Sequence, residues 1–159
     1  MSREVQVCNL SKVLEFDNNR VVRLVRVLDE RLPKNMRAPK GALSIAIMDN
    51  AKIAQVHKDF LGDPKPTDVI TFEGDGDGKF AGEICASAEM ARDVASKYSN
   101  TADAELCLYI AHGMLHLAGI DDIEPQDAKQ MREAEAIAAK IISSAFRKPI
   151  FKFKGYKDA

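Results

Sequence analysis

The protein has 159 residues, of which 46% are hydrophobic and 30% are charged, and its formal net charge is −1. This length suits one domain with a single core over residues 1–159, and the small net charge excludes a protein that coats nucleic acid non-specifically. No apolar stretch approaches the roughly 20 residues of a membrane span, and no signal-peptide segment is evident, so we expect a cytoplasmic protein without membrane contact. Three widely spaced cysteines predict buried, reduced thiols, which suits that compartment: Cys8, Cys85 and Cys107.

The first sixty residues predict two strands and two helices. Residues 3–9 alternate weakly between apolar and polar side chains, which is typical of a strand. Asp17 can cap a helix that runs to about residue 32. The continuous apolar run over residues 42–48 indicates a buried strand, and a short helix follows over residues 51–60.

The remaining sequence predicts two more strands and three helices. The strands cover residues 69–72 and 81–86, on either side of a glycine-rich loop. The helices cover residues 88–97, a long stretch from Thr101 or Asp103 to Ala118, and residues 125–144. Because strands and helices mix without a strict βαβ alternation, the order is typical of an α+β domain.

Basic residues gather in two places. One predicted helix carries an arginine at every third position: Arg20, Arg23 and Arg26. Residues 147–159 interleave five lysines or arginines with three aromatic residues. Such a mixture can follow phosphates while its rings stack on bases. Two interpretations stay open: contact with RNA, or a flexible tail and a solvated helix face.

The most informative segment is residues 111–122. His112 and His116 are four residues apart in an apolar run, so a helix places both imidazoles on one face. Gly119 follows where a helix can end in a left-handed residue, and the chain can then present Asp122 as a third ligand. The spacing resembles that of the metzincin zinc motif, with Asp in the last place. Since a catalytic zinc site uses three protein ligands and keeps one position open, the segment predicts zinc binding.

The general base of zinc peptidases is missing from this motif. In His-Glu-x-x-His the Glu is that base, and this chain has Gly113 in its place. A zinc ion can acidify water without that Glu, so hydrolysis of another kind of bond remains possible. A zinc hydrolase of peptide or amide bonds stays open as an alternative, although Gly113 argues against it.

Three segments resemble blocks of one known family in order and separation. Residues 112–122 resemble the motif His-Gly-x-Leu-His-Leu-x-Gly-x-Asp-His of the YbeY family, which comprises rRNA maturation factors. Residues 66–72, Pro-Thr-Asp-Val-Ile-Thr-Phe, resemble the family's Pro-Thr-Asp-Val-Leu-Ser-Phe block. Residues 81–87 are similar to its Leu-Gly-Asp-Ile-x-Ile-Ser strand. The resemblance covers about residues 43–140.

This resemblance implies a zincin-like fold, with a small four-stranded mixed sheet, about five helices and a metal site on a long helix. It implies a zinc-dependent single-strand endoribonuclease, with one zinc ion per chain on His112, His116 and Asp122. The implied partners are rRNA and ribosomal proteins, in maturation of the 16S 3′ end and ribosome quality control. A non-catalytic, ribosome-associated metal-binding factor remains a further alternative. The oligomeric state is not predicted.

Two positions depart from the family pattern. The third ligand of the family is usually His, whereas Asp122 adds a negative charge that zinc tolerates. Many relatives carry Tyr-Arg-Gly before the Pro-Thr-Asp block, whereas this chain has Leu61 in place of the Arg. A guanidinium that could hold a phosphate is therefore missing. Three lysines are candidates to supply positive charge instead: Lys58, Lys65 and Lys79.

Four further residues have both a functional and a structural interpretation. Glu83 is a candidate base, because the family block has Asp there, or else an edge residue that faces water. Asp68 either supports a metal ligand by hydrogen bonding or caps a turn. Asp121 either supports the neighbouring ligand or is simply exposed. His57 either contacts substrate or lies at the surface.

Overall fold

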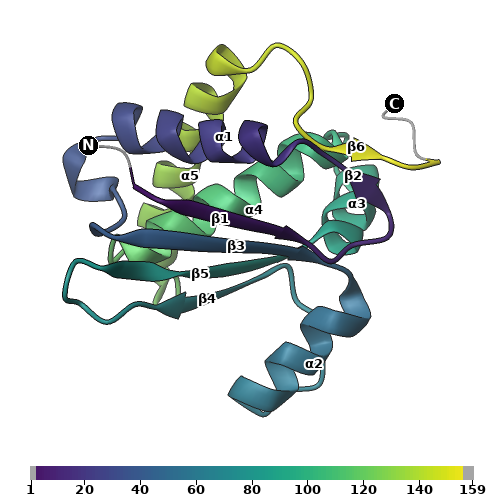
Figure 1. Ribbon diagram of the computed structural model, residues 1–159, viewed down its shortest axis with the longest axis horizontal. Coiled ribbons are helices and arrows are strands. Elements are labelled where there is room, and N and C mark those ends of the chain that lie inside the picture. The colour runs from purple at the N-terminus through teal and green to yellow at the C-terminus, as the bar shows by residue number, and fades with distance from the viewer. Residues whose placement is uncertain (1–2, 156–159) are drawn as a thin grey trace.

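The computed structural model describes residues 3–155 and contains one four-stranded mixed sheet (Figure 1). Its strand order is β1-β3-β5-β4, with β1, β3 and β5 parallel and β4 antiparallel to β5. The strands are β1 (Val5–Asn9), β3 (Ala42–Met48), β4 (Val69–Glu73) and β5 (Phe80–Ser87). All four were predicted, and so was the mixed character of the sheet.

Five α-helices surround this sheet (Figure 1). They are α1 (Asn18–Arg31), α2 (Asn50–Leu61), α3 (Ala88–Lys97), α4 (Ala102–Leu117) and α5 (Pro125–Ala145). Helix α4 packs against β4 and β5, and α5 packs against both α1 and α4. Helix α2 projects from the rest of the molecule in Figure 1 and contacts β5. No helix in the described range is long and apolar enough to cross a membrane.

Side-chain caps define where three of these helices begin; the cap at Asp17 was predicted, and Thr101 was one of two predicted starts of α4. Asp17 accepts a hydrogen bond from the Asn19 amide at the start of α1. Ser87 and Thr101 do the same for α3 and α4. Each cap satisfies an amide that has no partner inside its helix. Helix α4, which carries His112 and His116, therefore begins at a residue set by local sequence.

Gly113 lets α4 lie close to the sheet. A Cβ atom built on Gly113 would lie 2.7–2.9 Å from the side-chain carbons of Ile84 on β5, which is fully buried. Such separations are shorter than van der Waals contact, so a larger residue would push the helix off the sheet. The position that carries Glu in zinc peptidases thus faces the core here.

The C-terminal segment does not form a flexible tail over residues 147–155. Phe151 is only 2% exposed and packs edge-to-face on Phe16, with ring centroids 5.1 Å apart. Beyond it, β6 (Lys152–Phe153) pairs antiparallel with β2 (Leu14–Glu15). These two short strands were not predicted, because a two-residue strand carries no periodic signal. Tyr156 and the residues after it lie outside the described range.

Two of the three arginines on α1 hold this segment. The Arg20 guanidinium donates hydrogen bonds to the carbonyls of Pro149 and Lys148. Arg20 and Arg23 also lie over the Phe146 ring, 5.9 and 5.7 Å from its centroid. The regular spacing of these arginines therefore serves intramolecular packing.

Asp103 fixes the same segment from α4, and its removal is expected to destabilise the protein. Its Oδ1 atom accepts hydrogen bonds from the amides of Ile150 and Phe151, both at 2.8 Å. Asp103→Ala leaves these part-buried donors unpaired, which costs about 1–3 kcal/mol of unfolding free energy. Urea unfolding measures the loss.

Two further variants make this test specific. Asp103→Asn keeps an oxygen acceptor and should lose less stability than the alanine variant. Asp127→Ala removes a first-turn acid from α5 and should change stability by a few tenths of a kcal/mol. Equal losses in Asp103→Ala and Asp127→Ala would contradict the assigned role.

The prediction for the cysteines is right at two positions and wrong at one. Cys85 and Cys107 are buried free thiols. Burial, reinforced by the charge of Glu83, raises the pKa of Cys85 to about 12. Cys8 is exposed. It lies on edge strand β1, in register with Ala46 of β3 and, through it, with Cys85 of β5, so the three share one face of the sheet. Because α2 covers that face only near β5, it leaves Cys8 open to solvent.

Candidate metal centre

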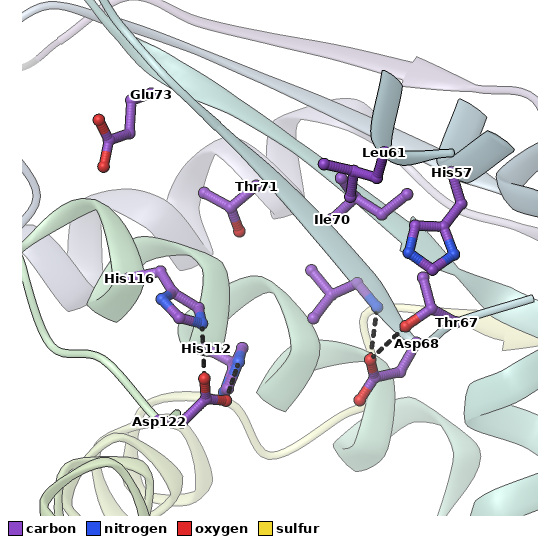
Figure 2. A pocket seen from close by; sticks show the side chains of 11 residues that line it. His57, Leu61, Thr67, Asp68, Ile70, Thr71, Glu73, His112, His116 and Asp122 are labelled. Atoms are coloured by element: carbon purple, nitrogen blue, oxygen red, sulfur yellow. Dashed lines mark hydrogen bonds and ion pairs between the residues drawn. The ribbon is translucent and has the colours of Figure 1, made fainter. Parts of the chain in front are cut away.

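The two histidines of α4 form one side of the site (Figure 2). The rings of His112 and His116 lie 4.8 Å apart between centroids, with an interplanar angle of 81°. Gly119 has a φ of 97°, and its amide donates to the His116 carbonyl at 3.0 Å. This left-handed residue ends the helical run and turns the chain back, as predicted.

Asp122 returns to the same place and completes a three-residue group. Its Oδ2 and Oδ1 atoms lie 3.6 and 3.5 Å from Nε2 of His112 and of His116, respectively. These separations exceed an ordinary hydrogen bond of about 2.7–3.2 Å. Ligand atoms placed about 2.0–2.1 Å from one tetrahedral ion lie roughly 3.3 Å apart. The three side chains therefore fit a single divalent cation.

Glu135 on α5 orients the first histidine, and the sequence analysis missed it. His112 Nδ1 lies 2.9 Å from Glu135 Oε1. Because a carboxylate only accepts, Nδ1 carries the hydrogen and Nε2 is left free for a metal ion. One feature of the sequence could have indicated Glu135: it lies one helical turn after the buried Met131 and next to the buried Ala134, beside the buried face of α5.

The carboxylates around His112 raise the pKa of its imidazole. Burial by itself lowers the pKa of this imidazole, but the hydrogen bond and charge of Glu135 outweigh it. The charges of Asp122 and Asp68 add to the effect, so the pKa of His112 lies above its ordinary value. A metal ion that binds His112 must therefore compete with a proton that this imidazole holds more strongly than an ordinary histidine does.

An open pocket of about 410 Å³ lies beside the metal group (Figure 2). It lies between α2, β4 and the end of α4. The lining residues are His57, Leu61, Thr67, Asp68, Val69, Ile70, Thr71, Glu73, His112, His116 and Asp122. None of these described residues is a lysine or arginine, so the three lysines proposed as phosphate contacts do not line the pocket. Leu61, the position of the family Arg, does line it.

The structure brings two of the uncertain candidates into this pocket. Asp68 lines it and accepts hydrogen bonds from the Val69 amide at 2.8 Å and the Thr67 hydroxyl at 3.2 Å. Asp68 thus caps the start of β4 and also contributes charge at His112. His57 lines the opposite side of the pocket, on α2. Asp121 is exposed outside the pocket, where it accepts from the Asp122 amide.

The structure does not bring Glu83 to the site. Its neighbour Ile84 meets α4 at Gly113, and side chains alternate along a strand, so Glu83 lies on the other face of β5. There its Oε1 atom lies 3.5 Å from the Cys85 thiol. The glutamate that lines the pocket is instead Glu73, which pairs in register with Gly82 on the α4 face. Strand parity was the signal that would have favoured Glu73.

Comparison with known proteins agrees with this geometry. The model of the family described as Endoribonuclease YbeY matches residues 6–142. The chain belongs to the YbeY family. Proteins named Endoribonuclease YbeY include one from Carboxydothermus hydrogenoformans, 30% identical over 82% of this chain and 91% of its own length. Another, from Bacillus mycoides, is 32% identical over 74% of this chain and 85% of its own length.

Two further similarities, one to a sequence and one to a solved structure, cover different shares of the matched proteins. The Rhodopirellula baltica relative is 40% identical over 65% of this chain, and the match spans 55% of its own length. A solution structure of a Thermotoga maritima protein superposes with a TM-score of 0.64 over 90% of this chain and 91% of its own. Its sequence identity is 24%, so this likeness supports the α+β fold alone.

Proposed function

We propose that this protein is a metal-dependent endoribonuclease that hydrolyses phosphodiester bonds of single-stranded RNA in the pocket beside His116. The observation that carries the proposal is the convergence of two imidazoles and one carboxylate at the wall of an open pocket. The names of the YbeY relatives, Endoribonuclease YbeY, support RNA as the substrate class.

The side chains divide the work between metal binding and proton transfer. His112, His116 and Asp122 would hold a divalent ion, and Glu135 keeps His112 in the tautomer that offers Nε2. When bound, such an ion polarises a phosphoryl oxygen and makes water more acidic. Asp68 and Glu73 are the other carboxylates of the lining, and a carboxylate is a group that can accept the proton of an attacking water.

Apolar side chains beside the pocket suit unstacked bases. Phe60 and Leu61 at the end of α2 are 69% and 61% exposed, and Leu61 lines the pocket. Single-stranded RNA offers base faces that bind to such surfaces, whereas paired RNA hides them. The proposal extends to zinc as the ion, rRNA as the substrate, ribosomal proteins as partners and the cytoplasm as the compartment.

A cleavage assay with purified protein tests this function. Zinc-loaded protein is incubated with an end-labelled, single-stranded rRNA fragment, and the products are resolved by electrophoresis. Cleavage is expected to stop when a chelator removes the ion and to return when zinc is restored. No cleavage by the zinc-loaded protein, together with co-sedimentation with ribosomes, would instead favour a non-catalytic factor. Chelator-sensitive cleavage of peptides would favour an amide hydrolase.

A further inference from the structure

His57 is the histidine outside the metal group that lines the same pocket. It lies on α2 one helical turn before Leu61, so both side chains face the pocket from this helix. Figure 2 shows them on one side of strand β4, with the metal group on the other side. His57 therefore occupies the α2 wall of the pocket.

One hydrogen bond fixes which nitrogen of His57 is free. Nδ1 lies 2.9 Å from the carbonyl oxygen of Lys65. A carbonyl oxygen can only accept, so Nδ1 carries its hydrogen whether the ring is neutral or charged. Within residues 3–155 no hydrogen bond or ion pair involves Nε2. Nε2 is thus the atom that gains a proton when the ring becomes cationic.

The charges of the pocket lining indicate which kind of ligand suits Nε2 of His57. The lining has three carboxylates, from Asp68, Glu73 and Asp122, and no lysine or arginine among its described residues. A phosphate chain needs hydrogen-bond donors or positive charge along its path. Apart from the metal group, His57 is the lining side chain whose ring can donate from Nε2 to a phosphate when both nitrogens carry hydrogen.

We propose that protonated His57 binds an RNA phosphate through Nε2–H on the α2 side of the pocket. It supplies there the contact that Leu61 cannot make. This inference rests on the proposed function for its ligand, a single-stranded polyphosphate chain. The other titratable groups of the lining are Asp68 just before β4, Glu73 on β4, His112 and His116 on α4, and Asp122. Lys58 and Asp59 follow His57 on α2 itself.

The test measures binding of a phosphorothioate RNA oligonucleotide to the zinc-loaded protein by fluorescence anisotropy. His57→Gln is expected to weaken binding roughly tenfold, because a charge-assisted hydrogen bond is lost. Adding Leu61→Arg to His57→Gln should restore affinity, because it places a cation one turn further along the same face.

Lys58→Gln is the matched control, since it removes a cation from the exposed surface of α2 outside the pocket. It should change affinity less than twofold. Unchanged affinity in His57→Gln would overturn the inference, and so would loss of bound zinc from that variant. If RNA binding depends on His57 but no RNA is cleaved, the proposed nuclease activity is refuted and the phosphate contact is supported. Cleavage with His57→Gln binding like wild type would refute the contact alone.

Discussion

His116→Ala is expected to lose its bound metal ion and to lower the rate of RNA cleavage at least about a hundredfold. Two of the three ligands, whose ligand atoms lie within 4.8 Å of one another, would remain. Removing only a residue that hydrogen-bonds to a ligand typically costs 10–100-fold in metal affinity, so removing a ligand itself should cost at least as much. Asp122 would keep one imidazole partner, at 3.6 Å. Elemental analysis after dialysis, paired with the electrophoretic cleavage assay, measures both losses.

His57→Ala is the matched control for metal content. It also removes an imidazole from the pocket, but it should retain one ion per chain, because His57 is outside the metal group. Circular dichroism should show the same helix content in both variants, since His116 is in the last turn of a helix whose buried face is apolar. If His116→Ala still cleaved RNA at the wild-type rate without metal, the activity would belong to a contaminating nuclease.

Glu135→Gln is expected to weaken zinc binding tenfold or more near pH 8, with a parallel loss of cleavage at limiting zinc. The neutral amide can still accept the Nδ1 hydrogen of His112, but it no longer makes the imidazole a stronger base. Isothermal titration with zinc measures the affinity. Glu133→Gln on the exposed side of the same helix is the matched control and should bind zinc like wild type.

The pH dependence of the same variant follows from the pKa of His112. In the metal-free protein Glu135 is the main cause that raises this pKa, so its removal lowers it. As the pH falls, wild-type His112 takes up a competing proton first, and its zinc affinity declines first. The variant begins to lose affinity at a lower pH, so the difference between the two proteins should shrink on acidification. A constant ratio from about pH 8 to about pH 6 would refute this account.

Much of the fold could be predicted because its signals are local. The caps at Asp17, Ser87 and Thr101 each depend on a side chain and an amide two or three residues away. The left-handed turn at Gly119 depends on the missing Cβ atom of one residue. Helical periodicity alone placed His112 and His116 on one face.

Other features depend on residues far apart in the chain and left no local pattern. The Asp103 contacts span 47 and 48 residues, and they turn a basic segment that resembled a flexible tail into a docked one. Whether Glu83 or Glu73 lines the pocket depends on which face of β5 meets α4. That face carries Ile84, which lies against Gly113, so the neighbouring Glu83 lies on the opposite face.

The sequence by itself determined the family and the three candidate metal ligands, because short-range spacing on one helix and its terminating turn specifies both. Only the tertiary structure decided the surroundings of that site. Glu135 reaches His112 from a separate helix, and His57 reaches the pocket across β4. Their positions are set by the packing of whole elements against the sheet, where burial and excluded volume act between residues that are distant in sequence.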